Sequence, residues 1–152
     1  IILELKQMTI LITFLLVLLT DQLTKYLVVQ NFSLGETMPL IENIFHFTYV
    51  RNHGAAFGIM QGQQWFFIIA TILLLGGIIF FYKELPLHNL WNRLALGLAI
   101  GGAIGNLIDR VRLGYVIDFI DLRVWPVFNI ADSSVVIAVT IFSYWLLIID
   151  GN

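Results

Sequence analysis

The sequence of 152 residues contains no cysteine and little charge. Without cysteine the chain has no disulfide bond, thiol nucleophile or thiolate metal ligand. Charged residues make up 12% of the chain, against about 25% in an average soluble domain. The net charge of -2 argues against nucleic acid as the main partner, because phosphate binding depends on a basic surface.

Several catalytic motifs are missing as well. The three histidines show no metal-binding spacing such as HExxH, and no glycine-rich phosphate loop opens a helix. The serine-nucleophile motifs GxSxG and SxxK do not occur. We therefore expect neither a metal nor another cofactor.

Apolar residues are in excess, at 59% of the sequence with a mean hydropathy of +0.91. Too little polar surface remains to cover a water-soluble globule, so the lipid bilayer is the expected solvent. We see no repeat or linker and predict one domain, an α-helical integral membrane protein with four transmembrane helices. The apolar runs that form these helices are residues 8–29, 65–82, 94–108 and 129–149.

The first run reaches the length of about 20 residues that a span needs only if its helix includes Asp21 and Lys25. Their i, i+4 spacing places them on one helical face, where they can pair. Two interpretations are open. The lysine either reaches the membrane interface from the end of the helix, or the pair supports a polar site inside the bundle.

The third run carries Gly97, Gly101 and Gly105 at intervals of four residues, with Gly102 beside them. We interpret these glycines as packing positions, since small residues at this spacing let a neighbouring backbone approach closely. Such packing would bring the polar end of this helix near another span.

Residues 30–64 are too polar and too broken by turns to cross a membrane. Within them Phe45, Phe47 and Tyr49 recur at every second position, which predicts a small antiparallel sheet. Its backbone groups need water or protein partners, so we expect the sheet at the membrane surface. Four spans place both termini on one side, and the lysine and arginine count does not choose that side.

The most polar stretch, residues 105–132, holds four aspartates, three arginines and two asparagines. Ionisable groups are costly near lipid and usually functional. Asn106, Asp109 and Arg110 share one helical face, either as a self-contained cluster at a helix end or as a scaffold for a neighbouring carboxylate. We predict that residues 109–127 form a loop on the same side as residues 30–64.

Two pairs of polar residues follow in this stretch. Asn129 is a good N-cap for the fourth helix, and Asp132 in its first turn suits the helix dipole. Asp118 and Asp121 lie in the apolar context VIDFIDL, which does not suit a solvated loop. At the start of the fourth span, Asp132 followed by Ser133 and Ser134 is more polar than capping requires.

Two aspartates can hydrolyse an amide without a thiol, a serine or a metal. When they lie close together they share one proton, because both cannot ionise cheaply. The ionised carboxylate takes a proton from water, and the protonated one hydrogen-bonds the scissile carbonyl. Asp118 and Asp132 are 14 residues apart, so the chain between them must fold back. On residue patterns alone, Asp109 and Asp121 remain rivals for the pair.

The chain resembles the lipoprotein signal peptidases, the bacterial signal peptidase II family, from about residue 8 onward. Five motifs occur in the order of that family. They are DQLTK at 21–25, RNHGAAFG at 51–58, GGAIGNLIDR at 101–110, VIDF at 116–119 and FNIAD at 128–132. Any one of them alone would be weak, but five in order are specific.

The resemblance implies an intramembrane aspartyl endopeptidase with a small extracytoplasmic β-sheet after the first helix. Such enzymes lie in the bacterial cytoplasmic (inner) membrane, with cytoplasmic termini and the active site near the outer surface. They remove the signal peptide from diacylglyceryl-modified prolipoproteins, cutting on the N-terminal side of the lipidated cysteine. The implied partners are this prolipoprotein substrate, membrane lipids and the inhibitor globomycin, a cyclic peptide.

By motif, Asp118 and Asp132 match the catalytic pair of the family. The positions that match substrate-binding or supporting residues are Asn52, Gly54, Asn106, Arg110, Asn129, Asp109, Asp21 and Lys25.

Three other classes of function predict different behaviour. A small transporter or channel would carry polar residues along several spans. A metal-dependent membrane hydrolase or lipid-headgroup transferase would lose activity to a chelator such as EDTA. A non-catalytic scaffold would tolerate Asp118→Ala.

Overall fold

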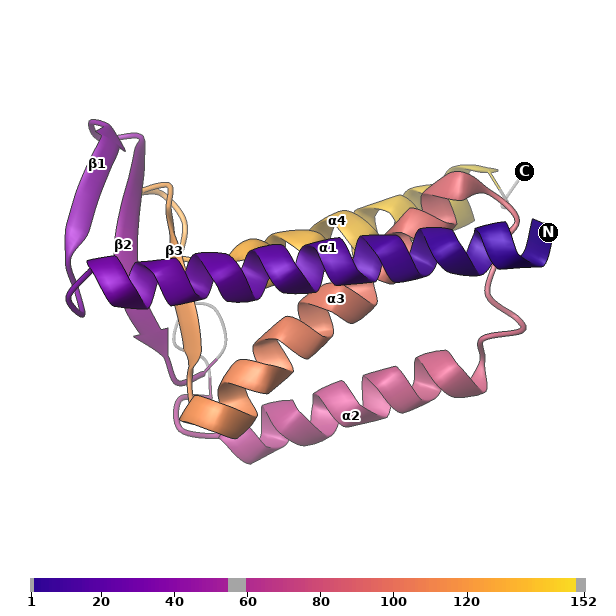
Figure 1. The fold of residues 1–152 in the computed structure, drawn as a ribbon, viewed down its shortest axis with the longest axis horizontal. Coiled ribbons are helices and arrows are strands. Elements are labelled where there is room, and N and C mark those ends of the chain that lie inside the picture. Colours follow the sequence, from indigo (N-terminus) through magenta and orange to yellow (C-terminus); the bar gives the residue numbers. More distant parts are fainter. Residues whose placement is uncertain (1, 55–59, 150–152) are drawn as a thin grey trace.

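The apolar runs form helices that lie along the length of the molecule, with a small sheet at one end (Figure 1). The computed structural model describes residues 2–54 and 60–149. The helices are α1 (Ile2–Asn31), α2 (Gln64–Phe80), α3 (Leu90–Leu113) and α4 (Ile130–Tyr144), and a π-helical turn, Trp145–Ile149, extends α4. The start of α1 and the end of α4 lie away from the sheet, at the other end of the molecule.

Three of these helices are long and apolar enough to cross a membrane, over Leu5–Asn31, Leu90–Leu113 and Ile130–Ile148. With 17 residues, α2 is about 26 Å long, at the lower end of the length that a span needs. Its outer side chains are exposed, with Leu73 at 69% and Ile79 at 77%. Such surfaces suit lipid, and the predicted fold class, a helical membrane protein with a small antiparallel sheet, is confirmed.

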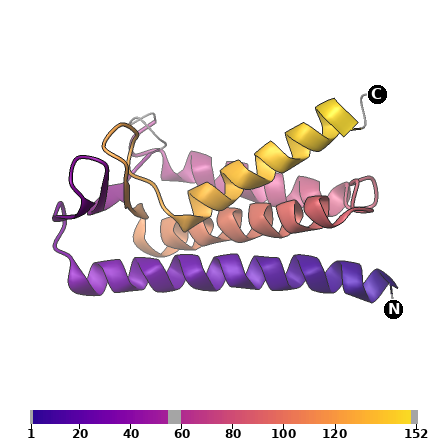
Figure 2. The ribbon, with the colours of Figure 1, turned by 90° about the horizontal axis from the view of Figure 1, so that it is seen from above.

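The central helix is α3, which packs against each of the other three (Figure 2). Its glycines make this packing close. A Cβ atom added to Gly97 would lie 2.6 Å from Cβ of Thr13 in α1, and one added to Gly105 would lie 2.6 Å from Oδ2 of Asp21. Gly102 faces the backbone of Ala131 in α4. The interpretation of the glycines as packing positions is confirmed.

The sheet has three antiparallel strands in the order β1 (Thr37–Ile41), β2 (Phe45–Asn52) and β3 (Val116–Asp121). The alternating residues 45–49 lie in β2, as the sequence predicts. The third strand comes from after α3 and pairs with β2, with Val50 opposite Asp118 and Asn52 opposite Val116. The sheet thus brings the polar segment between α3 and α4 beside the one that follows α1.

The prediction of a loop at residues 109–127 is wrong for much of that segment. Helix α3 continues to Leu113 and ends at Gly114, whose φ of 78° is the left-handed conformation typical of a helix C-terminus. Strand β3 follows almost at once. Its residues Val116–Phe119 are buried, because β3 pairs alongside β2 and packs against α1 and α3.

Candidate active site

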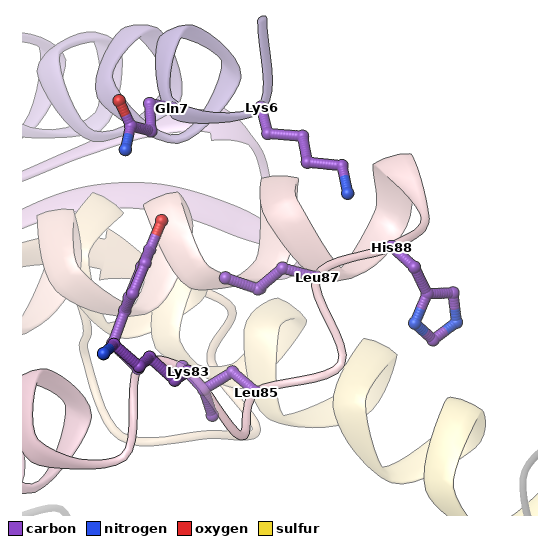
Figure 3. A pocket seen from close by; sticks show the side chains of 7 residues that line it. Lys6, Gln7, Lys83, Leu85, Leu87 and His88 are labelled. Atoms are coloured by element: carbon purple, nitrogen blue, oxygen red, sulfur yellow. The ribbon is translucent and has the colours of Figure 1, made fainter. Parts of the chain in front are cut away.

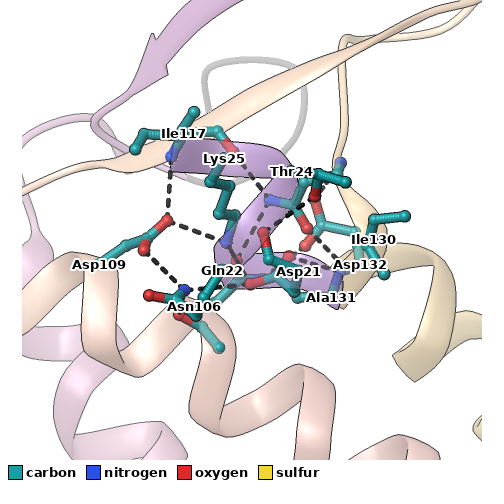
Figure 4. A network of polar contacts seen from close by, with 12 residues as sticks. Asp21, Gln22, Thr24, Lys25, Asn106, Asp109, Ile117, Ile130, Ala131 and Asp132 are labelled. Carbon is teal, nitrogen blue, oxygen red and sulfur yellow. Dashed lines mark hydrogen bonds and ion pairs between the residues drawn. The ribbon is translucent and has the colours of Figure 1, made fainter. Parts of the chain in front are cut away.

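Most of the buried polar side chains that the structure describes meet where α1, α3, α4 and β3 converge (Figure 4). This cluster includes nearly all of the site residues that the sequence predicts. Buried there are Asp21, Lys25, Asn106, Asp109, Asp118 and Asn129. Burial of so many polar groups is tolerable only when each finds a partner, and the contacts below supply the partners.

Asn129 caps α4 and at the same time contacts both predicted catalytic aspartates. Its side-chain Oδ1 accepts a hydrogen bond of 2.8 Å from the backbone N–H of Asp132, and the Asp132 carboxylate accepts one of 3.4 Å from the Asn129 N–H. This is a reciprocal capping box. The Nδ2 of Asn129 donates a further bond of 2.7 Å to Oδ1 of Asp118. The capping interpretation of Asn129 is therefore confirmed, but capping uses only part of the side chain.

Asp118 is held from its other side by Asn52 of β2. The Asn52 Nδ2 donates a hydrogen bond of 2.9 Å to Oδ2 of Asp118, and the backbone N–H of Gly54 donates one of 2.9 Å to Oδ1 of Asn52. Gly54 thus fixes which end of the amide faces the aspartate. The RNHGAAFG motif continues to residue 58, and its residues 55–58 lie outside the described part of the chain.

Asp132 is held by α3. The Nδ2 of Asn106 donates a hydrogen bond of 2.7 Å to Oδ1 of Asp132, while Oδ1 of Asn106 accepts from Asn129 at 3.2 Å. The cluster on this face of α3 is therefore not self-contained. It reaches across to the first turn of α4.

Lys25 is an interior residue and does not reach the membrane interface, since its side chain is only 2% exposed. Its Nζ lies 2.9 Å from Oδ2 of Asp21 and 2.9 Å from Oδ2 of Asp109. Of the two interpretations of the Asp21–Lys25 pair, only the one inside the bundle agrees with this burial.

The fold back between β3 and α4 brings Asp118 and Asp132 to the same Asn129. Phe128 forms an antiparallel bridge with Ile120, with backbone hydrogen bonds of 2.8 and 3.1 Å. The chain therefore reverses between the two aspartates, as their separation of 14 residues requires.

The two rival aspartates are engaged elsewhere. Asp109 pairs with Lys25 and accepts from the backbone N–H of Ile117 at 3.2 Å. Asp121, at the far end of β3, accepts from Oγ1 of Thr48 at 2.8 Å and pairs with Arg123 at 3.0 Å. Burial alone would raise the pKa of Asp121, but these hydrogen bonds outweigh burial and lower it below the ordinary value. Neither residue forms a hydrogen bond with Asn129 in the described part of the chain.

The environment of Asp118 is that of a carboxyl group which keeps a proton near neutral pH. Burial, the largest cause, raises its pKa to about 7, and repulsion from the Asp132 carboxylate adds to the increase. Hydrogen bonds from Asn52 and Asn129 act in the opposite direction but are weaker in sum.

Arg110 of α3 completes the charged surroundings. Its guanidinium carbon lies 4.9 Å from the centre of the Phe67 ring, and it interacts electrostatically with Asp132, Asp118 and Asp109. Its buried Nε has no hydrogen-bond partner within the described residues.

A cavity of about 390 Å³ opens next to Asp132. Its other lining residues are mainly apolar: Leu122, Trp125, Phe128, Ser133, Val136 and Ile137. A cavity of about 360 Å³ at the opposite end of the bundle is lined by residues of α1 and of the link between α2 and α3, among them Lys6, Lys83 and His88 (Figure 3). No predicted site residue lines that second cavity, whereas Asp132 lines the first.

Gln22 belongs to this network but was not among the residues that the sequence singled out. Its Nε2 donates to Oδ1 of Asp109 at 3.1 Å and to the carbonyl of Gly105 at 3.2 Å. The signal that could have found it is simple. A glutamine inside an apolar span needs a polar partner, and this one lies within the DQLTK motif.

Known proteins are similar to this chain in sequence and in fold. A family model described as Signal peptidase (SPase) II matches residues 13–148. A lipoprotein signal peptidase of Moorella thermoacetica is 48% identical over 145 residues, which cover 95% of this chain and 97% of the relative. One of Halothermothrix orenii is 46% identical over 135 residues, covering 89% and 92%.

Two solved structures of bacterial membrane enzymes, determined by the in meso method, are also similar. The one at 2.3 Å resolution has a TM-score of 0.86 and 38% identity, and the match covers 91% of this chain and 87% of that chain. The one at 1.9 Å has a TM-score of 0.84 and 38% identity, with coverages of 93% and 94%. The similarity therefore extends over nearly the whole fold.

Proposed function

The chain belongs to the signal peptidase II family, and we propose that Asp118 and Asp132 are the pair with which it hydrolyses its substrate. The protein is an aspartic peptidase, an integral membrane enzyme whose general role is to remove signal peptides from lipoproteins. The proposal concerns which residues act, where the substrate is cut and how the enzyme is oriented in the membrane.

One observation carries the assignment of the pair: the Asn129 side chain donates a hydrogen bond to the Asp118 carboxyl group and accepts one from the backbone N–H of Asp132. Both carboxyl groups lie beside polar donors that come from different elements, Asn52 for Asp118 and Asn106 for Asp132. Donors on fixed secondary structure hold reacting groups within the narrow tolerance that catalysis needs. The rival aspartates bind other groups, Asp109 the Lys25 ammonium and Asp121 the Thr48 hydroxyl.

The reaction follows from one shared proton. The first turn of α4 favours negative charge on Asp132, and burial favours the protonated form of Asp118. Ionised Asp132 takes a proton from water, whose oxygen bonds to the scissile carbonyl carbon. Protonated Asp118 donates a hydrogen bond to the carbonyl oxygen as negative charge develops there. A proton then passes to the amide nitrogen, the C–N bond breaks, and the amine leaves.

The surroundings of the pair suit a lipidated peptide. The cavity beside Asp132 is mainly apolar, and Trp125, which lines it, is 57% exposed. An acyl chain can therefore remain in lipid while the peptide reaches the carboxyl groups. We propose that the substrate is a diacylglyceryl-modified prolipoprotein, cut on the N-terminal side of the lipidated cysteine. Arg110, which interacts electrostatically with both aspartates, is proposed to help bind that substrate.

The proposed orientation places the sheet and the aspartates at the outer surface of the bacterial inner membrane and the termini in the cytoplasm. A chain without cysteine allows a direct test with Arg123→Cys near the sheet and Lys83→Cys near the other end. A membrane-impermeant thiol reagent added to intact cells is expected to label the first variant and not the second. The reverse labelling would overturn the orientation. We also propose inhibition by globomycin.

The function is tested by incubating the purified protein with a diacylated prolipoprotein and with its unlipidated form. Mass analysis is expected to locate one cut before the lipidated cysteine, and none in the unlipidated substrate. Asp118→Asn and Asp132→Asn are each expected to abolish the cut while the thermal unfolding transition persists. Full activity in either variant would remove that aspartate from the pair, and equal cleavage of both substrates would refute the substrate class.

A further inference from the structure

We propose that Lys25 is a positioning residue for the aspartate pair, because its ammonium group holds the two carboxylates that fix the backbone directly before Asp118 and Asp132. This inference rests on the proposed function, since it assumes that these two aspartates react. It assigns to the first helix a role in catalysis beyond helix packing.

The ammonium group of Lys25 is fully used inside the protein. Its three N–H donors face three acceptors: Asp21 at 2.9 Å, Asp109 at 2.9 Å and Oδ1 of Asn106 at 3.0 Å. The side chain is 2% exposed. A lysine with no free donor and no access to solvent does not bind substrate or transfer a proton, so its effect passes through its partners.

One branch leads to Asp132. The Asp21 carboxylate uses Oδ2 for Lys25 and Oδ1 for the backbone N–H of Ala131, at 3.0 Å. Ala131 directly precedes Asp132. Asn106 reaches Asp132 from another direction, because the bond from Lys25 to its Oδ1 leaves its Nδ2 pointing at the Asp132 carboxylate.

The other branch leads to Asp118. The Asp109 carboxylate contacts Lys25 and accepts a hydrogen bond of 3.2 Å from the backbone N–H of Ile117. Ile117 directly precedes Asp118. The two aspartates thus have the same support: a carboxylate paired with Lys25 accepts from the backbone N–H of the residue before each of them (Figure 4).

The charge of Lys25 also acts on the pair. The charged groups around Asp118 are Lys25 of α1, Arg110 and Asp109 of α3, and Asp132 of α4. Lys25 lowers the pKa of Asp118, against the larger effects of burial and of Asp132. Loss of this positive charge therefore favours protonation of the pair, and the pH range in which the enzyme cleaves its substrate moves to higher pH.

The test is Lys25→Met, with Lys6→Met as the matched control at the other end of α1. The kcat of Lys25→Met on a diacylated prolipoprotein is expected to fall at least ~tenfold with KM changed less than ~threefold, because misplaced reacting groups slow the chemical step. Its pH–rate profile is expected to move up by about one pH unit. Lys6→Met is expected to keep the wild-type values.

The position of the profile does not depend on how much enzyme is folded, so it can be read even if Lys25→Met is unstable. Asp21→Asn combined with Lys25→Met restores the net charge but not the contacts. In this double variant the pH–rate profile is expected to return to its wild-type position, while kcat stays low. Wild-type kcat in the double variant, or an unmoved profile in Lys25→Met, would overturn the proposal.

The cleavage activity of Asp118→Asn is measured alongside these variants. It separates failure of the proposed role of Lys25 from failure of the proposed catalytic pair. If Asp118→Asn is inactive and Lys25→Met behaves as wild type, only the role of Lys25 falls. If Asp118→Asn is active, the catalytic pair itself is refuted, whatever Lys25→Met shows.

Discussion

The Nδ2 of Asn129 donates a hydrogen bond of 2.7 Å to Oδ1 of Asp118, and this bond joins the N-cap of α4 to strand β3 of the small sheet. The same residue orders the first turn of α4, in which Asp132 lies. Correct capping of α4 and correct placement of the two carboxyl groups therefore depend on one side chain. Its two functions can be separated by substitution.

Asn129→Asp is expected to keep the cap and lose the donor, because aspartate caps helices about as well as asparagine but cannot donate from an ionised carboxylate. A hydrogen bond to a charged group contributes about 1.5–3 kcal/mol, so kcat is expected to fall roughly tenfold or more. Unfolding temperature and steady-state cleavage are the measurements. Asn89→Asp is the control, since Asn89 caps α3 and accepts from Asn92 away from the aspartates. Equal activity in both variants would contradict the prediction.

Asp118→Asn is expected to change how stability depends on pH. The folded-state pKa of Asp118 is raised from 3.8 to about 7, so between these values the folded protein holds a proton that the unfolded chain has released. The contribution of Asp118 to stability is therefore full below about pH 4 and is lost as pH rises through 7, by at most ~4 kcal/mol. The asparagine variant lacks this dependence.

Thermal unfolding from pH 4.5 to 8 measures this effect. The unfolding temperature of the wild type relative to Asp118→Asn is expected to decrease as pH rises. Asp121→Asn is the control with the opposite sign, because the pKa of Asp121 is lowered in the folded protein. A wild-type advantage over Asp118→Asn that stays constant with pH would show that Asp118 is ionised throughout this range.

Gly105→Ala is expected to disturb the site from outside it. The added Cβ would lie 2.6 Å from Oδ2 of Asp21, so the Asp21 carboxylate or helix α1 must move. Overpacking of this kind costs about 1–3 kcal/mol of stability, and it weakens the contact of Asp21 with Ala131. We expect a lower unfolding temperature together with slower cleavage.

The matched control for Gly105→Ala is Gly76→Ala in α2, where an added Cβ meets nothing within 4 Å among the described residues. That variant is expected to be unchanged or more stable by up to ~1 kcal/mol, because alanine favours helix over glycine. If both variants behaved alike, the close approach of α1 to α3 at Gly105 would have no energetic consequence.

Asp121→Asn is expected to retain cleavage within about threefold while losing roughly 1–3 kcal/mol of stability. The carboxylate of Asp121 bonds Thr48 and Arg123 at the end of the sheet and does not contact Asn129. Cleavage and unfolding of the same preparation measure the two effects. Abolished cleavage in a folded Asp121→Asn protein would return Asp121 to the list of candidates for the pair.

Much of the fold could be predicted because its causes are local. The surplus of apolar residues predicts a membrane protein, uninterrupted apolar runs predict the helices, and the alternation at residues 45–49 predicts β2. Glycines at intervals of four predict the face of α3 that neighbouring helices approach closely. The cause is again local, since helical periodicity places these glycines on one face. Asn129 as a cap follows from its position before an apolar run.

The partners of the polar residues could not be predicted, because they lie far apart in the sequence. Lys25 and Asn106 are separated by 81 residues, and Asp21 and Ala131 by 110. Periodicity shows that Asp21 and Lys25 share a face, but only the packing of α1 on α3 buries that face. Strand β3 was missed because residues 116–121 become a strand only beside β2.

By itself, the sequence determined the membrane environment, the helices, the surface sheet and the likeness to one family, since each depends on composition or on residues near one another in the chain. Only the tertiary structure decided which aspartates meet at Asn129 and which are bound elsewhere. The reason is physical. A buried carboxyl group takes its chemical character from the charges and donors around it, and those neighbours are assembled by folding.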